Sequence, residues 1–555
     1  MIGLVTTTAA GRTAAARLGA ALAETRAYDV RELAEAWRDC DSLVCFLATG
    51  ATVRLLAPLL HDKATDPGVV VVDEGCHFAV ALLGGHGGGA NELARQVADV
   101  LDATPVITTA SDAVGLPGLD TLGWPVEGAV AAVSRALLDG LDVRLEADAI
   151  WPLPPMPVGD TGEHVVRLTD RLVEADPRTV VLRPPSLVLG IGSSRGVSTA
   201  EVLELVDTTL RDAGLSAASV HGVATADAKA DEPGLLQACR ERGWELVTYS
   251  SGQLAEVEVP NPSAAPQRAI GTPSVAEAAA LLASGGELVV VKRKSAMATC
   301  AVARRRPRGR LALVGLGPGA RDLLTPRAQA ELRRAAVWVG LDQYVDQVRD
   351  LARPGTRMLI TGLGKEEERA HSAVAEAEKG YCVALLGSGD AGVYAMASPA
   401  LEVAGADIDV VGVPGVTAAL AASNLLGAPL GHDHASISLS DLHTPWPAIE
   451  ARIRAVAEAD LVVTFYNPSS RGRDWQLPKA VAMLLEHRPA STPVGIVTDA
   501  SRPRETVVLT TLGELDPTQV TMFACVLVGS SQSTVVGGRM VTPRGYRWAE
   551  PEPTG

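Results

Sequence analysis

Several glycine-rich turns in the carboxy-terminal half directly follow short apolar runs. The first, Gly315-Leu316-Gly317-Pro318-Gly319, follows Leu311–Val314 and precedes a helical segment. Three later turns hold polar residues, at Ser388-Gly389-Asp390, Pro414-Gly415-Val416-Thr417-Ala418 and Asn467-Pro468. Glycine allows the backbone to approach a ligand closely, and α/β sheets bind ligands at the carboxyl ends of their strands. The turns therefore predict a small-molecule site, although the first lacks the third glycine of the dinucleotide fingerprint.

Basic residues follow the last of these turns, at Arg471, Arg473 and Lys479. A planar guanidinium group can bind a carboxylate through two hydrogen bonds. We therefore expect Arg471 and Arg473 to bind an acidic substrate. For Arg502 and Arg504, which follow Asp499, a solvated surface position is an equal alternative.

A second glycine-rich segment lies in the amino-terminal half, where Gly84-Gly85-His86-Gly87-Gly88-Gly89 precedes a helix that begins near Asn91. The free N–H groups and the dipole of a helix amino terminus favour an anion, so a phosphate or a carboxylate would suit this segment. The alternative is that His86 and Asn91 only cap the helix.

The elements that must position these residues are strands and helices in alternation. Buried strands are predicted at Leu43–Leu47, Val69–Val72, Val180–Leu182, Leu187–Gly190, Leu288–Val291, Leu311–Val314, Val383–Leu386 and Leu461–Phe465. Helices are predicted at Ala14–Glu24, Asn91–Leu101, Ala200–Ala213, Val275–Ala283 and Pro326–Ala336. This alternation indicates an α/β, multidomain protein with largely parallel sheets.

Two joints divide the chain, which at 555 residues has room for three or four domains of roughly 150 residues. Trp151–Pro157 is too rich in proline for a helix interior or a central strand, and Arg304–Arg310 holds five arginines around Pro307. The arginine run favours a solvated linker over a nucleic-acid patch, because the rest of the chain is acidic. The expected divisions are 1–118 (α/β domain), 119–185 (short middle region or linker), 186–303 (α/β domain), 304–310 (linker), and the two lobes 311–414 and 415–548.

The composition excludes several classes of protein. A net charge of −16 argues against binding to nucleic acid or to an anionic membrane surface. The uncharged stretch Val411–Gly431 contains Pro414 and Pro429, which favours a strand, turn and helix over a membrane span. Seven scattered cysteines without C-x-x-C spacing predict neither disulfides nor a metal site. Together with the absence of a signal-peptide pattern in Met1–Thr8, this predicts a cytoplasmic location.

The carboxy-terminal half resembles the tetrapyrrole methylases, which transfer methyl groups from S-adenosylmethionine to porphyrinoid carbons. Within them it is most similar to the precorrin-3B C17-methyltransferases of cobalamin biosynthesis, over residues 309–548. The matching segments are Gly315–Ala328, Ser388–Ala397, Gly427–Asp433, Ser438–Trp446 and Tyr466–Leu477. Ala320 stands where the commonest loop of the family has Asp, which affects one polar contact.

This resemblance implies a two-lobed class III methyltransferase fold, a homodimer, and S-adenosylmethionine as cofactor. It implies cofactor contacts from Gly315, Gly317, Pro318, Gly319, Ser388, Gly389, Asp390, Val393, Thr417, Ala418 and Asn467. The Asp390 carboxylate would lie near the sulfonium, ribose or amino group, with a turn-forming aspartate as the alternative. The implied reaction is methylation of C17 with ring contraction of precorrin-3B, or of its cobalt form, to precorrin-4.

Ring contraction also requires proton transfer. His432, His434 and Asp441 are the candidates, because histidine can exchange a proton near neutral pH. A structural role for each is an equal alternative.

Residues 1–303 resemble the cobalt-precorrin-5A hydrolases, which open a lactone and release acetaldehyde. The family pattern G-H-x-G-G-A-N-E-L-A is matched by Gly85–Ala94, with Gly87 where leucine is expected, and residues 120–180 match least. Such chemistry needs a water activator, which could be His86 as general base with Glu92 or Glu74 orienting it, and an oxyanion stabiliser. Lys229, Lys292 and Lys294 could bind either the propionates of the substrate or the oxyanion. Lys292 and Lys294 alternate along a predicted strand, so exposure to solvent is their alternative.

Three other interpretations stay open from the sequence. The methylase could act at another ring position, although the Tyr466–Leu477 motif argues against it. The amino-terminal half could be a tetrapyrrole-binding module without catalysis. A dinucleotide oxidoreductase would instead bind nicotinamide at Gly315–Gly319.

Overall fold

The computed structural model describes residues 1–62, 65–85, 87–110, 114–470 and 473–546. These residues form two compact units. The amino-terminal unit comprises Met1–Trp151, Pro155–Pro307 and Arg353–Gly355, and the carboxy-terminal unit comprises Pro152–Pro154, Arg308–Ala352 and Thr356–Gly555. Each unit is built from α/β elements, so the predicted α/β multidomain class is confirmed.

The amino-terminal unit begins with a six-stranded sheet in the order β2-β1-β3-β4-β5-β6. Its strands are parallel except at the β4–β5 pair, and β4 is buried along its whole length. Helices α1 and α4 pack on one face, and α2 and α3 on the other. The strands are β1 (Ile2–Thr6), β2 (Thr25–Asp29), β3 (Ser42–Phe46), β4 (Gly68–Val72), β5 (Phe78–Leu83) and β6 (Thr104–Val106), and the helices are α1 (Ala9–Ala21), α2 (Leu33–Asp39), α3 (Thr49–Leu56) and α4 (Ala90–Leu101).

Residues 119–185, expected to be a short middle region or linker, contain a second sheet in the order β7-β10-β9-β8. Strands β8, β9 and β10 are parallel, and β7 is antiparallel to β10. The elements are β7 (Val126–Gly128), α6 (Val130–Leu138), β8 (Val143–Ala147), β9 (His164–Leu168) and β10 (Thr179–Leu182). The proline-dense Trp151–Pro157 contains neither helix nor strand, as predicted.

A third sheet completes this unit, in the order β13-β12-β11-β15-β14. Strands β11, β12 and β13 are parallel, whereas β14 and β15 form an antiparallel hairpin against β11. The strands are β11 (Leu187–Ser193), β12 (Val220–Ala226), β13 (Glu245–Tyr249), β14 (Glu287–Lys294) and β15 (Ala298–Arg304). The helices are α7 (Thr199–Asp212), α8 (Pro233–Arg242), α9 (Ser251–Ala255), α10 (Ala264–Ile270) and α11 (Ala276–Ser284).

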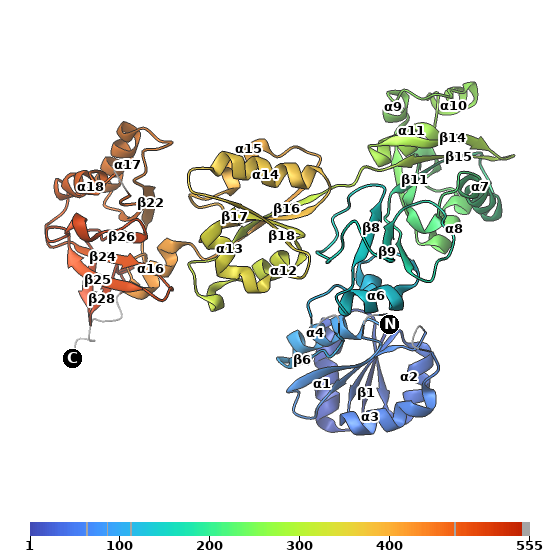
Figure 1. Ribbon diagram of the computed structural model, residues 1–555, viewed down its shortest axis with the longest axis horizontal. Coiled ribbons are helices and arrows are strands. Elements are labelled where there is room, and N and C mark those ends of the chain that lie inside the picture. Colours follow the sequence, from blue (N-terminus) through green and yellow to red (C-terminus); the bar gives the residue numbers. More distant parts are fainter. Residues whose placement is uncertain (63–64, 86, 111–113, 471–472, 547–555) are drawn as a thin grey trace, which may run out of the picture. The chain divides into compact units, whose positions relative to one another are not determined.

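The first lobe of the carboxy-terminal unit is an all-parallel sheet in the order β18-β17-β19-β16-β20. Helices α14 and α15 cover one face, and α12 and α13 cover the other (Figure 1). The strands are β16 (Arg310–Gly315), β17 (Val337–Leu341), β18 (Arg357–Thr361), β19 (Cys382–Gly387) and β20 (Asp409–Val413). The helices are α12 (Pro326–Arg334), α13 (Asp342–Val348), α14 (Glu366–Glu378) and α15 (Ala397–Val403).

The second lobe contains a mixed sheet in the order β22-β23-β26-β24-β25 and a small sheet β21-β28-β27. Only the β22–β23 pair of the larger sheet is parallel. The strands are β21 (Gly427–Ala428), β22 (His434–Ser438), β23 (Val462–Tyr466), β24 (Pro493–Thr498), β25 (Thr506–Thr511), β26 (Ala524–Val528), β27 (Thr534–Val536) and β28 (Arg539–Val541). The helices are α16 (Ala418–Leu426), α17 (Trp446–Glu458) and α18 (Gln476–Leu485).

Three expectations about sequence segments can be compared with these elements. Within Val411–Gly431, β20 ends at Val413 and α16 follows, as predicted, and among the described residues no helix has the length and apolar character to cross a membrane. Arg304 is the last residue of β15 and Arg310 is the first residue of β16, although both were expected in the linker. Arg304 forms an ion pair with Asp170 of the amino-terminal unit, and Arg310 forms ion pairs with Glu331 and Asp409 of the carboxy-terminal unit. All seven cysteines are free thiols, and only Cys76 is not buried.

Candidate functional site

Three glycines bring three loops into direct backbone contact in the carboxy-terminal unit. Strands β19, β16 and β20 are adjacent and parallel, so the loops after them begin at one edge of the sheet. A Cβ atom on Gly415 would lie 2.1 Å from the carbonyl oxygen of Gly389, and one on Gly315 would lie 2.8 Å from the same oxygen. Only glycine fits at such distances, and we call Gly315, Gly389 and Gly415 the glycine junction.

Hydrogen bonds hold the junction closed. The Gly317 amide donates to the Gly389 carbonyl at 2.9 Å, and the Gly389 amide donates back to Gly317 at 2.8 Å. Both residues have positive φ, +72° and +65°, which glycine adopts without strain. The predicted cofactor loop after β16 and the turn after β19 are therefore one rigid assembly.

Asp390 secures the third loop. Its Oδ1 accepts from the Gly392 amide at 2.8 Å, and its Oδ2 accepts from the Gly415 amide at 3.0 Å. The carboxylate thus has the turn-forming role that was the alternative to cofactor contact, while it also lies at the predicted binding edge. Its assignment as a catalytic and cofactor-binding residue stays a prediction.

The second lobe adds polar groups through β23 and the start of α16. Thr417 Oγ1 lies 2.7 Å from Tyr466 Oη, which also accepts from the Ala419 amide at 2.9 Å. Burial raises the pKa of Tyr466 above its ordinary value, so the phenol stays neutral. Val393 and Ala418 pack against the same apolar cluster as Tyr466.

Asn467 follows Tyr466 in a left-handed conformation, with φ of +49°. Its Nδ2 donates to Ser438 Oγ at 3.0 Å, which links the ends of β22 and β23. The structure thus gives the predicted cofactor-binding Thr417, Ala418 and Asn467 adjacent positions.

Arg502 is a residue of this site that the sequence did not distinguish from solvated surface. Its Nε donates to the Pro318 carbonyl at 2.8 Å, and its terminal nitrogen donates to Ser388 Oγ at 3.4 Å. A Cβ atom on Gly319 would lie 2.5 Å from the Arg502 side chain, so glycine makes room for it. Arg502 therefore joins the second lobe to both of the first two loops.

Arg473, predicted to bind substrate, links its own loop to the residue that follows β22, and its role in substrate binding stays a prediction. Its guanidinium donates to the carbonyls of Leu439 and Asn467, at 3.0 and 2.8 Å, and to Ser470 Oγ at 3.1 Å. Burial lowers the pKa of Arg473, and the nearby Asp441 opposes that shift. Arg471 lies outside the described residues.

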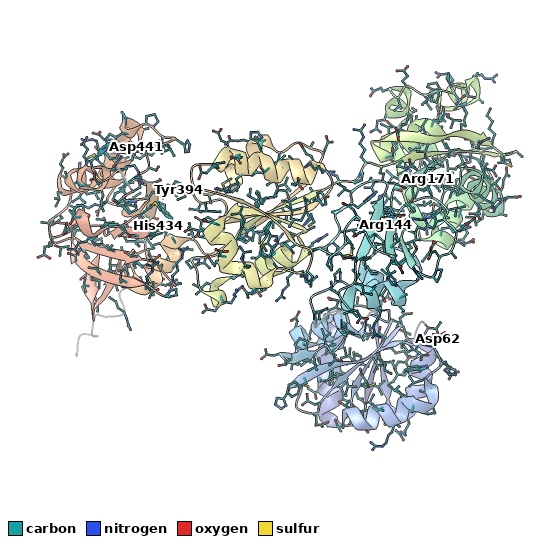
Figure 2. All side chains as sticks on the ribbon, in the orientation of Figure 1. Asp62, Arg144, Arg171, Tyr394, His434 and Asp441 are labelled. Atoms are coloured by element: carbon teal, nitrogen blue, oxygen red, sulfur yellow. The ribbon has the colours of Figure 1, made fainter. Side chains whose placement is uncertain are left out.

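The candidates for proton transfer lie in the second lobe, where His432 and His434 are exposed and Asp441, after β22, is half-buried. His434 begins β22, and Tyr394 of the first lobe donates to the Ser436 carbonyl of that strand at 2.8 Å (His434, Asp441 and Tyr394 are labelled in Figure 2). The proton-transfer roles stay predictions. His432 Nδ1 accepts from the Asp433 amide at 2.8 Å. The structure gives neither histidine a contact with the glycine junction.

The amino-terminal candidates can be placed only in part, because His86 lies outside the described residues. Glu92 is exposed on α4 and pairs with Arg95 and Gln96, each at 3.4 Å, and Glu74 accepts from Thr8 at 3.2 Å. Asn91 is 5% exposed and donates to Thr109 at 3.0 Å. Glu92 and Glu74 therefore have other partners, and their orienting role stays a prediction.

The three candidate lysines lie in different surroundings. Lys229, after β12, lies 3.6 Å from Glu232, which is buried and accepts from the Gly196 amide at 2.7 Å. Lys292 donates to the Asn261 carbonyl, and its amide bonds to the buried Glu277 at 2.9 Å. Lys294 is exposed on β14. These contacts do not bring the lysines together.

Comparison with protein families matches the chain in three segments. Residues 310–516 match the Tetrapyrrole (Corrin/Porphyrin) Methylases. Residues 31–112 match the Cobalamin synthesis G N-terminal family and residues 187–303 the Cobalamin synthesis G C-terminus family. The match to the methylases covers the glycine junction and Arg502, and the two other matches cover most of the amino-terminal unit's first and third sheets.

Individual relatives match one half of the chain each. The chain is 46% identical to a probable cobalt-factor III C(17)-methyltransferase of Salmonella typhimurium, over 42% of this chain and 99% of that protein. It is 35% identical to a cobalt-precorrin-5A hydrolase of Priestia megaterium, over 47% of this chain and 78% of that protein. It is 41% identical to a cobalt-factor III methyltransferase of Priestia megaterium over 43% of this chain. The matching segment of this chain spans about half (46%) of the length of that relative.

Proposed function

The chain belongs to the tetrapyrrole methylases through its carboxy-terminal half and to the cobalamin synthesis G proteins through its amino-terminal half, and on this premise we propose that it performs two steps of cobalamin biosynthesis. The carboxy-terminal half methylates C17 of a precorrin-3B-type macrocycle and contracts its ring to the precorrin-4 type. The amino-terminal half opens the lactone of cobalt-precorrin-5A and releases acetaldehyde.

The glycine junction is the observation that carries the methyltransferase proposal. Ser388, Asp390 and Thr417 lie in the loops that meet there, and their hydroxyl and carboxylate groups suit the amino, carboxylate and ribose groups of S-adenosylmethionine. When bound, this cofactor supplies an electrophilic methyl group on a sulfonium. The residues of the chain contribute binding and orientation, because an in-line transfer depends on positioning more than on an acid–base pair.

The substrate proposed for the methyltransferase is the cobalt-bearing macrocycle, because both methyltransferase relatives described above are named for cobalt-factor III. The purified chain is incubated with S-adenosylmethionine and precorrin-3B, with and without cobalt, and the products are followed by mass spectrometry. One methyl group gained at C17 with ring contraction is expected from the cobalt form. Methylation at another carbon, or none in either metal state, would overturn the assignment.

The hydrolase proposal is tested by acetaldehyde release from cobalt-precorrin-5A, measured with alcohol dehydrogenase and NADH. We propose His86 as the base with Glu92 orienting it, and Lys229, Lys292 and Lys294 as binding groups for acid side chains or the oxyanion. His86→Ala is expected to lower the rate of release by about a hundredfold or more. His77→Ala, which removes an exposed histidine paired with Asp73, is the matched control.

We further propose a homodimer formed through the methyltransferase half and a cytoplasmic location. Light scattering of the purified chain would give twice the chain mass of 57.5 kDa for a dimer. A monomer at all concentrations tested would exclude it.

A further inference from the structure

A cavity in the amino-terminal unit lies at the carboxyl ends of three adjacent parallel strands. It measures about 430 Å³ and is lined by residues that follow β8, β9 and β10, together with the end of β15. Because β8, β9 and β10 run parallel, their carboxyl ends meet at one edge, which is where open α/β sheets bind ligands. Its volume is at the small end of the range for ligand pockets, about 300–1,000 Å³.

The lining is rich in arginine although the whole chain is acidic. Arg171, Arg304, Arg305 and Arg306 line the cavity against three carboxylates, Asp148, Asp170 and Glu287. We call this cavity the arginine pocket. Its lining charge of +1 (four minus three) contrasts with the chain's −16.

Two of the arginines have a fixed structural role in the pocket. Asp170 is only 4% exposed and accepts two hydrogen bonds from the Arg304 guanidinium, at 2.7 and 2.9 Å, and one from Ser186 at 2.7 Å. The negative charge of Asp170 is therefore balanced by the Arg304 guanidinium within the pocket lining. Arg305 donates to the Pro185 carbonyl at 3.4 Å.

The other two arginines keep their donors available. Arg171, which follows β9 and is labelled in Figure 2, and Arg306 are both exposed. No hydrogen bond or ion pair joins either guanidinium group to another described residue. Each can therefore bind a carboxylate through two parallel hydrogen bonds.

An aromatic wall completes the arrangement. Trp151 lines the pocket, and its ring is held edge-on to Trp124 with 5.8 Å between the ring centroids. An indole side chain beside two guanidinium groups without partners among the described residues suits a macrocycle whose rim carries acid side chains.

We propose that the arginine pocket binds the carboxylate side chains of the tetrapyrrole substrate of the amino-terminal half, an inference that rests on the proposed hydrolase function. The run Arg304–Arg310 would then be partly a substrate-binding element, in addition to joining the units. Arg171 and Arg306 would bind the carboxylates of the substrate. Arg304, through its bonds to Asp170, would fix the part of the pocket lining that positions these two arginines.

The kinetic test uses the full chain with Arg171→Gln and Arg306→Gln combined. The KM for cobalt-precorrin-5A is expected to rise by at least about tenfold while kcat for acetaldehyde release changes by less than about twofold, since charge-assisted hydrogen bonds to substrate are lost. Arg268→Gln, which removes one exposed arginine of α10 where the test variant removes two, is the control for loss of a surface arginine and should leave both parameters unchanged. Arg304 is not substituted, because its removal would leave the buried Asp170 carboxylate without its ion-pair partner.

A second measurement detects binding of substrate to the arginine pocket without catalysis. Phenylglyoxal modifies free guanidinium groups, and peptide mass spectrometry locates each adduct. Saturating cobalt-precorrin-5A is expected to slow modification of Arg171 and Arg306 by about threefold or more, while Arg268 reacts as before. Acetaldehyde release without this protection, or with an unchanged KM in the double variant, would overturn the pocket proposal. Protection without any acetaldehyde release would instead support the pocket and overturn the hydrolase function.

Discussion

At the scale of single residues, the glycine junction leaves no room for a methyl group on Gly315 or on Gly415. The Cβ of Gly415→Ala would lie 2.1 Å from the Gly389 carbonyl oxygen, a backbone atom that cannot rotate away, so the loops must separate. Overpacking of this kind costs about 1–3 kcal/mol. We expect methyl transfer to fall by at least about tenfold, as measured by incorporation of labelled methyl groups.

The control for this substitution lies three residues earlier. A Cβ on Gly412, in β20, would have no atom within 4 Å, so Gly412→Ala should leave methyl transfer unchanged. Equal losses in the two variants would mean that the junction has no special role.

Arg502 is the residue whose importance is visible only in the folded chain. Removing its side chain in Arg502→Ala breaks the bonds to Pro318 and Ser388, so the KM for S-adenosylmethionine should rise by about three- to tenfold. Arg504→Ala removes an exposed neighbouring arginine and should not change that KM. An unchanged KM in both variants would refute a positioning role for Arg502.

The candidate site could be predicted from sequence as far as its loops, but not in the roles of its side chains. The glycine turns at 315–319, 388–390 and 414–418 were identifiable because each follows an apolar run, and they do meet at one edge. Arg502 was not identifiable, since its partner Pro318 lies 184 positions away. Arg473 is predicted to bind substrate because a guanidinium group suits carboxylates, and that role stays a prediction. The sequence could not show the acceptors that the fold supplies to it, which are Ser470 and the Asn467 carbonyl in the same loop and the Leu439 carbonyl after β22.

At the scale of elements, the predicted strands are all present, from Leu43–Leu47 (β3) to Leu461–Phe465 (β23). Runs of Val, Leu and Ile predict most of them because those strands are buried on both faces, whereas β14, at the edge of its sheet, is buried only at Val290. The sheet at 119–185 was not predicted as such. Its β8 has the sequence V-R-L-E-A, with alternate residues exposed, so it lacks a continuous apolar run.

One contact between elements should respond to pH. Glu201 on α7 accepts from the Ser295 hydroxyl and the Met297 amide, both at 2.6 Å, and these bonds hold the turn between β14 and β15. The Ser295 hydrogen bond, followed by that of Met297, lowers the pKa of Glu201. A lowered pKa in the folded state means that the stabilisation is present above the ordinary carboxyl pKa and is lost as pH falls through the lowered value.

Glu201→Gln is therefore expected to unfold at a lower temperature than the unsubstituted chain at pH 7. That difference should shrink as the pH falls below about 4. Thermal unfolding followed by circular dichroism across this range provides the measurement. A difference that stays constant with pH would show that the charge of Glu201 contributes nothing.

At the scale of the whole molecule, the apolar clusters that pack against the first and third sheets and within the two carboxy-terminal lobes each lie within one unit. The two activities are therefore expected to be separable, so Gly415→Ala should release acetaldehyde from cobalt-precorrin-5A at the unsubstituted rate. Loss of both activities in that variant would indicate coupling.

The burial of six of the seven thiols gives the native chain a single attachment point for chemical probes. Burial raises the pKa of Cys45, Cys300 and Cys525 to about 12 and that of Cys239 and Cys382 to about 11, and it also raises the pKa of Cys76. What distinguishes Cys76 is that its thiol is partly accessible to a reagent, whereas the other six are buried. A maleimide dye at pH 7 should add once to the folded chain, at Cys76, and seven times after denaturation, as intact-mass spectrometry would show. Labelling at a second cysteine would contradict this; a single label would make the amino-terminal unit observable by fluorescence without any engineered residue.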